Sequence, residues 1–129
     1  MKHFRKSVSA VLMAFAAATA AVGVQAQDYP NRTIRIVTPY DPGSMVDSTT
    51  RLVADELSKK LGQPVVVENR SGGMGLVAMN ALMNAPADGY TLMTDTPASA
   101  INPTLNPAAK YNAKTEIAPI AQFMKLPFV

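Results

Sequence analysis

Residues 34–51 read Ile-Arg-Ile-Val-Thr-Pro-Tyr-Asp-Pro-Gly-Ser-Met-Val-Asp-Ser-Thr-Thr-Arg, and this stretch decides how the rest of the chain is interpreted. An extended apolar segment ends at two prolines, a turn follows at Gly43 and Ser44, and a helical pattern begins near Met45. The stretch therefore predicts a strand, a short loop and a helix N-terminus. Unpaired backbone N–H groups and the helix dipole make such a junction suitable for binding an anion. The alternative is that Gly43 and Ser44 only shape a turn.

The composition is that of an ordinary globular domain and excludes several kinds of chemistry. The chain has 129 residues, of which 48% are hydrophobic and 16% charged, so we expect one folded domain. There is no cysteine, and the only histidine is His3. A thiolate nucleophile, a histidine-based triad and a Cys/His zinc site are therefore excluded beyond the N-terminal segment. We expect no catalytic residue, no metal site and no cofactor.

The first 26 residues have the features of a cleaved signal peptide. A positive n-region is formed by Lys2, Arg5 and Lys6. An apolar run at 10–24 follows, and residues 24–26 (Val-Gln-Ala) have small residues where a signal peptidase cuts. The alternative is a membrane anchor, but the run is short for a span of about 20 apolar residues. We expect export to the periplasm, with residues 1–26 as signal peptide and 27–129 as the mature chain.

The signal peptide also accounts for the basic character of the chain. The formal net charge is +3, and three basic residues lie in the first 26. The mature chain is therefore neutral, and we expect no nucleic acid among its partners.

The mature chain alternates between strand and helix patterns. The predicted strands lie at residues 33–38, 65–67, 90–94 and 117–129. The second of these is a continuous apolar run, which is typical of a strand covered on both faces. The predicted helices lie at residues 45–61 and 76–85, and a polar segment at 103–116 winds loosely before the last strand. This order predicts an α/β fold with an open, mainly parallel sheet and flanking helices.

The helix predicted at 45–61 has recognisable ends and one apolar face. Asp47 lies in the first turn, where the helix dipole favours a carboxylate, and Gly62 follows the last turn as a left-handed cap. We expect its buried face to contain Val46, Val53, Leu57 and Leu61, with Leu52 alongside.

Loops rich in small polar residues follow the first three predicted strands. They lie at residues 39–47, 68–75 and 94–100. Ligands of open parallel sheets bind beyond the carboxyl ends of the strands, so these loops predict a binding crevice. Neither a dinucleotide fingerprint nor a P-loop lysine is present. The remaining donors are backbone N–H groups and hydroxyls, with Asn69 and Asn102 nearby, which suit a small carboxylate.

The candidate ligand-binding residues come from these loops. They are Pro42, Gly43, Ser44, Asp47, Ser71, Gly72, Gly73, Gly75, Thr96 and Ser99. Asp47 either receives a ligand ammonium group or stabilises its helix, and we favour the second role. Arg70 either pairs with a ligand carboxylate or pairs with Glu68, and we favour the pairing with Glu68.

Several blocks of the mature chain resemble one family. They are Tyr29-Pro30, Pro42-Gly43, Asp47, residues 61–70 (LGQPVVVENR), residues 88–92 (DGYTL) and Asn102-Pro103. These blocks are similar to the Bug family, the periplasmic solute-binding proteins of tripartite tricarboxylate transporters. The resemblance implies a periplasmic-binding-protein-like fold with a ligand held between two lobes. It also implies that backbone groups and ordered waters of the first two loops, at residues 42–47 and 71–75, hold a ligand carboxylate.

The chain departs from the family at two places in these loops. Ser44 and Met45 follow Pro-Gly where the family has further glycines, and Met74 stands where the family has a small residue. The two methionines either narrow the crevice or contact an apolar part of the ligand. The mature chain is long enough for most of the first lobe only. We therefore expect a fragment of a longer protein, from either an incomplete sequence or a truncated gene.

The resemblance implies an exported, non-catalytic receptor that captures a small organic acid for a tripartite tricarboxylate-type uptake system. Its partners would be the organic acid and, transiently, the membrane permease subunits. The alternative is a sensor that presents the bound solute to a membrane signalling protein. Genes for permease subunits or for a sensor kinase beside this one would discriminate between the two.

Overall fold

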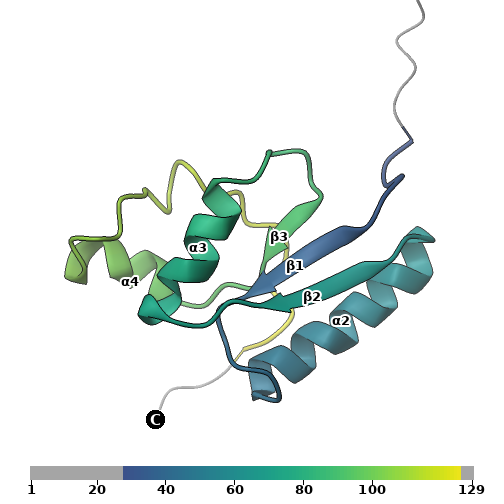
Figure 1. Cartoon of the computed structure of the whole chain (residues 1–129), viewed down its shortest axis with the longest axis horizontal. Helices are drawn as coiled ribbons and strands as arrows, with labels where there is room; N and C mark the ends of the chain where they lie inside the picture. Colours follow the sequence, from purple (N-terminus) through teal and green to yellow (C-terminus); the bar gives the residue numbers. More distant parts are fainter. Residues whose placement is uncertain (1–27, 126–129) are drawn as a thin grey trace, which may run out of the picture.

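A computed structural model describes residues 28–125, whose centre is a three-stranded parallel sheet (Figure 1). The strands are β1 (Ile34–Thr38), β2 (Val65–Asn69) and β3 (Thr91–Met93), in the order β2-β1-β3. Because β1 lies in the middle, Ile34, Ile36 and Val37 are at most 6% exposed. The predicted α/β class with an open parallel sheet is confirmed. The proposed signal peptide lies outside the described residues.

Helices cover both faces of this sheet. The helical elements are α2 (Met45–Leu61), the short 3-10 helix η2 (Gly73–Gly75), α3 (Leu76–Met83) and α4 (Ala98–Leu105). α2 packs against β1 and β2, whereas α3 packs against β1 and β3, and Figure 1 shows the two on opposite sides of the sheet. From β1 the chain continues to β2 on one side, and from β2 it passes β1 to reach β3 on the other side. The segments that leave β1 and β3 therefore run in opposite directions, and ligands of such sheets bind between two strands of this kind.

The ends of α2 agree with the prediction. The Ser44 hydroxyl accepts a hydrogen bond from the Asp47 N–H at 3.2 Å and so caps the first turn. At the other end Gly62 has φ +66°, and its N–H donates to the Ser58 carbonyl at 3.0 Å. A residue with a Cβ adopts this left-handed conformation at a cost, which explains the glycine.

The buried face of α2 agrees with the predicted one only in part. Val46 is buried and Val53 and Leu57 are half-buried, whereas Leu52 is 67% exposed and Leu61 37%. Asp47, Thr50 and Ala54 are buried as well. Thr50 can be buried because its hydroxyl donates to the Val46 carbonyl at 2.7 Å and lies 2.9 Å from the Thr94 hydroxyl. Apolar periodicity did not reveal this polar contact, which turns the helix away from Leu52.

The prediction that the second strand is covered on both faces is also wrong. In the described part of the chain β2 pairs only with β1 and forms an edge of the sheet. α2 packs against one face of β2, whereas α3 packs against β1 and β3, and Val66 is 51% exposed on the face that α2 does not cover. A continuous apolar run alone does not show that a helix covers each face of a strand.

Two further differences lie in the C-terminal third of the chain. Residues 98–105, predicted as loop, form α4, and the Asp95 carboxylate lies just before the helix. That carboxylate accepts from the Thr96 N–H at 2.8 Å and from the Ser99 hydroxyl. Residues 117–125, predicted as part of a strand, have no regular structure, because no neighbouring strand within the described residues pairs with them. No helix in residues 28–125 is long and apolar enough to cross a membrane.

Candidate functional site

The loops that follow the three strands meet around one cavity at the carboxyl edge of the sheet. Its volume is about 450 Å³, and it lies where the connections from β1 and β3 diverge. Of the predicted site residues, the cavity is lined by Ser71, Gly72, Gly75, Thr96 and Ser99. Outside its lining are Pro42, Gly43, Ser44, Asp47 and Gly73. Met74 lines the cavity and Met45 does not.

Asp47 holds the first loop in place by hydrogen bonds and lies outside the cavity lining. Its side chain is 2% exposed and accepts hydrogen bonds from the Gly43 N–H at 2.9 Å and from Asn69 Nδ2 at 2.7 Å. Arg51 Nε also donates to Oδ2 at 3.0 Å. The hydrogen bond from Arg51, followed by those from Gly43 and Asn69, lowers the pKa of Asp47 from 3.8 to about 2. Asp47 is thus a structural carboxylate, as favoured from the sequence.

Asn69 links Asp47 to Tyr40, a residue that lines the cavity. Its Nδ2 also donates to the Tyr40 carbonyl at 2.9 Å. Tyr40 lines the cavity, and its hydroxyl donates to the Thr96 Oγ1 at 3.1 Å. The first and third loops are therefore joined across the cavity by one tyrosine side chain.

The second loop requires unusual backbone conformations. Gly72 has φ +118° and Gly75 has φ +90°, and a Cβ on Gly75 would lie 3.5 Å from the Cβ of Pro39 in the first loop. Met74, between them, has φ +56° without being glycine. These values let the chain turn sharply beside the cavity into η2 and α3. The N–H groups at the start of α3 already have partners in this turn, because Gly75 donates to the Gly72 carbonyl at 3.0 Å and Leu76 donates to the Gly73 carbonyl.

The third side of the cavity is formed by α4 and by Tyr111. Asn102 is 2% exposed, and its Nδ2 donates to the Met74 carbonyl at 2.7 Å, which fixes the second loop to α4. The Tyr111 hydroxyl donates to the Ser99 carbonyl at 2.8 Å. Burial, partly opposed by a hydrogen bond with Asn102, raises the pKa of Tyr111. Its hydroxyl therefore stays protonated at neutral pH.

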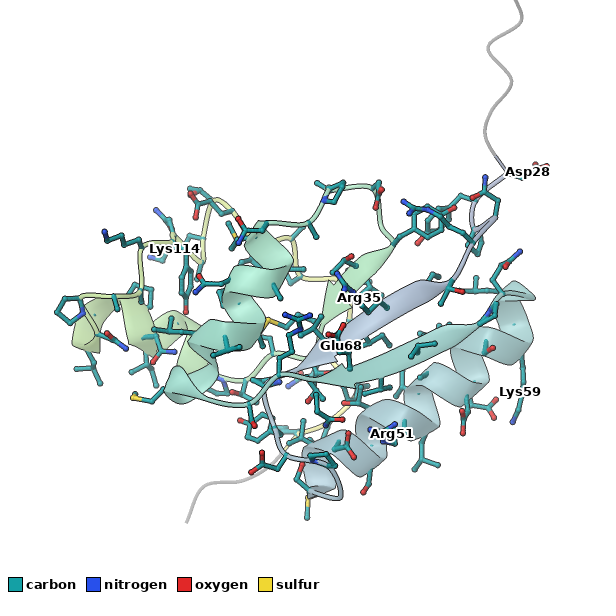
Figure 2. All side chains as sticks on the ribbon, viewed as in Figure 1. Asp28, Arg35, Arg51, Lys59, Glu68 and Lys114 are labelled. Carbon is teal, nitrogen blue, oxygen red and sulfur yellow. The ribbon has the colours of Figure 1, made fainter. Side chains whose placement is uncertain are left out.

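The basic side chains beside the second loop bind Glu68 instead of facing the cavity. Arg70 Nε donates to Glu68 Oε1 at 2.6 Å, and Arg35 Nη1 lies 3.2 Å from Oε2. Figure 2 shows Arg35 and Glu68 close together over the sheet. The predicted structural role of Arg70 is confirmed. No lysine or arginine in the described part of the chain lines the cavity.

The cavity therefore offers neutral hydrogen-bonding groups and two carboxylates. The hydroxyls belong to Tyr40, Ser71, Thr96, Ser99 and Tyr111, and the carboxylates to Asp41 and Asp95. Sequence reasoning did not select Tyr40, Asp41, Asp95 or Tyr111, and it named Asn102 only as a neighbour. The first three stand in the predicted loops and could have been included. No signal in the sequence places Tyr111 against α4.

Comparisons with known proteins agree with this architecture. A family model described as "Tripartite tricarboxylate transporter family receptor" matches residues 49–129. Protein BugT of Bordetella pertussis is 35% identical over 116 residues, covering 88% of this chain and 36% of BugT. The chain thus spans about a third of the length of that relative.

Two solved structures share the fold. MatC from Rhodopseudomonas palustris with bound malate gives a TM-score of 0.63 at 31% identity, covering 68% of this chain and 30% of MatC. A second R. palustris protein, solved with adipate, gives a TM-score of 0.53 at 39% identity, covering 55% of this chain and 24% of that one.

Proposed function

The chain belongs to the tripartite tricarboxylate transporter receptor family, and on this basis we propose that it forms most of the first lobe of an exported receptor for a small organic acid. The resemblance to the Bug family is thereby confirmed, and members of this family are solute-binding receptors rather than enzymes. In the proposed function, a second lobe closes over the bound acid. The loaded receptor then makes transient contact with membrane permease subunits.

The observation that carries this proposal is the cavity at the divergence between β1 and β3. Its neutral donors include Ser71 in the second loop, beside the start of η2 and α3. Backbone N–H groups of a loop and hydroxyl donors bind a carboxylate without a basic side chain. We therefore place the ligand carboxylate against residues 71–75.

The predicted residues outside the lining have a supporting role in this proposal. The Gly43 N–H donates a hydrogen bond to Asp47 Oδ2, and the Ser44 hydroxyl oxygen accepts one from the Asp47 N–H. These groups, with Pro42, set the course of the first loop that carries Tyr40 and Asp41. Gly73 serves the second loop in the same way, through its φ of +57°.

A pair of glycine variants tests the site. Gly72 lines the cavity at φ +118°, whereas Gly62 caps the far end of α2 at φ +66°, with nothing within 4 Å of an added Cβ. Gly62→Ala strains a left-handed backbone conformation at a cost on the order of 1–2 kcal/mol, and Gly72→Ala strains a conformation that essentially only glycine adopts, at a cost on the order of 1–3 kcal/mol. Only Gly72→Ala should weaken binding of organic acids, by about tenfold or more.

Calorimetric titration of the protein expressed from its native gene measures the two affinities, and circular dichroism checks the folding of each variant. Equal affinities in the two variants would contradict a carboxylate site at the second loop. Permease genes beside this gene would support the transport role.

Export is the remaining part of the proposal. It rests on the signal-peptide features of residues 1–26 and on the membership of an exported family. N-terminal sequencing of protein from the periplasmic fraction should begin at Gln27. A mature protein that retains Met1 contradicts cleavage.

A further inference from the structure

Methionine side chains line the cavity at different depths. In the described part of the chain they are Met74, which is 62% exposed, Met79, which is 1% exposed, and Met93, which is half-buried. Because the chain has no cysteine, the methionine thioether is its most readily oxidised side-chain group. A dissolved oxidant therefore reaches the sulfur of Met74 before the other two.

Hydrogen bonds hold the backbone of Met74 beside the cavity. Its carbonyl accepts a hydrogen bond from Asn102 Nδ2 at 2.7 Å, and Asn102 is buried in α4. The surrounding turn is closed as well, because the Gly75 N–H donates to the Gly72 carbonyl at 3.0 Å. A chemical change in the Met74 side chain therefore acts at the cavity instead of being relieved by movement of the loop.

The composition of the lining makes the polarity of this side chain important. The carboxylates of Asp41 and Asp95 line the cavity, whereas the lining has no lysine or arginine among the described residues. Oxidation turns the weakly polar thioether into a polar sulfoxide, whose oxygen is a hydrogen-bond acceptor. That oxygen competes for the hydroxyl donors of the lining and repels a ligand carboxylate, and no basic side chain of the lining offsets the repulsion.

We propose that Met74 is a reversible oxidation site, at which hydrogen peroxide converts the thioether to the sulfoxide and thereby weakens ligand binding in the cavity. The sulfur attacks one oxygen of the peroxide, so an S–O bond forms as the O–O bond breaks. The proton of the transferred hydroxyl passes to the leaving hydroxide, which departs as water. Sulfur loses two electrons and the peroxide gains them. The effect on binding rests on the proposed function, whereas the oxidation of Met74 does not.

Peroxide treatment of the protein expressed from its native gene tests the site. Peptide mass spectrometry should find an added oxygen on Met74 before Met79, and also on Met45, which is 64% exposed but outside the lining. Calorimetric titration with acetate, succinate and adipate compares the affinities before and after treatment. For each acid that binds, the affinity should fall about threefold to tenfold. Methionine sulfoxide reductase should restore it in step with the loss of oxygen from Met74.

Two leucine variants separate Met74 from the other methionines. Met74→Leu keeps an apolar side chain that cannot form a sulfoxide, and Met45→Leu makes the same change at an equally exposed position outside the cavity. The readout is the change that peroxide causes within each variant. Peroxide should leave the affinity of Met74→Leu as it was and should lower that of Met45→Leu as in the parent. Circular dichroism checks the fold of each protein before and after treatment.

The outcomes separate this inference from the proposed function. Unchanged affinity of a parent protein with oxidised Met74, or an equal loss in Met74→Leu, overturns the proposal. Oxidation of Met79 before Met74, or recovery of affinity while the Met74 sulfoxide persists, also overturns it, and this readout needs no variant. In each of these cases the organic-acid function stands. Binding of none of the three acids before oxidation overturns the proposed function and this inference together.

Discussion

The Tyr111 hydroxyl donates a hydrogen bond to the Ser99 carbonyl at 2.8 Å, and this bond replaces one that α4 cannot make for itself. In an α-helix the carbonyl of Ser99 would accept from the N–H of residue 103. That residue is Pro103, which has no N–H. Tyr111 therefore supplies the missing donor to a buried residue and fixes the following segment against the helix.

This relationship predicts that substitutions at Tyr111 and Pro103 have non-additive effects on the free energy of unfolding. Tyr111→Phe should lower the free energy of unfolding by about 0.5–1.5 kcal/mol, because the Ser99 carbonyl loses its donor. Adding Pro103→Ala to that variant should recover part of the loss, since alanine restores the backbone N–H.

A double-mutant cycle by urea denaturation of the protein expressed from its native gene measures the coupling between the two positions. Strictly additive effects of the two substitutions would show that Tyr111 does not compensate for Pro103.

The same bond explains why sequence reasoning found most of the fold but missed α4. β1, α2 and β3 are local patterns of apolar spacing and capping, and Ser44 and Gly62 mark the ends of α2. α4 contains a proline and short polar side chains, which read as a loop. Its stability depends on Tyr111, a contact between distant positions that no local pattern records.

Lowering the pH should reveal the contribution of ionised Asp47 to the free energy of unfolding. Its pKa is about 2 in the folded chain, below the ordinary value of 3.8, so its ionised form stabilises the fold. That stabilisation is fully present above about pH 5, and it is lost as the pH falls from about 4 through 2. Asp47→Asn should be less stable than the parent at pH 7 and should lack this loss below pH 4.

Urea midpoints of the protein expressed from its native gene, between pH 2 and pH 7, measure the effect. Asp55→Asn is the matched control, because Asp55 is exposed on the same helix. Parallel curves for the parent and Asp47→Asn would contradict the structural role of this carboxylate.

Met74 should be strained where a glycine would not be. Its φ of +56° and ψ of +35° cost a residue with a Cβ on the order of 1–2 kcal/mol. Met74→Gly should therefore raise the free energy of unfolding by up to about 1 kcal/mol after the entropic cost of glycine. It should also widen the cavity, because Met74 lines it.

Met45→Gly is the control for this substitution. Met45 and Met74 are 64% and 62% exposed, but Met45 lies in the first turn of α2 and outside the cavity lining. Met45→Gly should instead lower the free energy of unfolding by about 1 kcal/mol. Urea denaturation of both variants, made in the protein expressed from its native gene, measures these changes. A destabilised Met74→Gly variant would refute the assignment of strain.

The candidate site was predictable to the extent that strand ends determine it. Parallel strands bring their following loops to one edge, so the order of strands and loops along the chain is enough to group Ser71, Thr96 and Ser99. Which loop groups face the cavity depends on hydrogen bonds between loops. The Asp47 carboxylate accepts the Gly43 N–H, and the Asp47 N–H donates to the Ser44 hydroxyl oxygen, which could not be read from residue types alone.

The last prediction concerns residues 27–129 as an isolated polypeptide. Leu52, Leu105 and Ile120 are each at least 67% exposed, and Val66 is 51% exposed on the edge strand β2. An unpaired strand edge beside exposed apolar side chains favours association between copies. We expect this polypeptide to aggregate or to unfold without a cooperative transition. Leu105→Ser with Ile120→Ser should delay aggregation, because both side chains are exposed. Sedimentation and thermal unfolding followed by circular dichroism test this, and a monomer with one sharp transition would show that these surfaces need no partner.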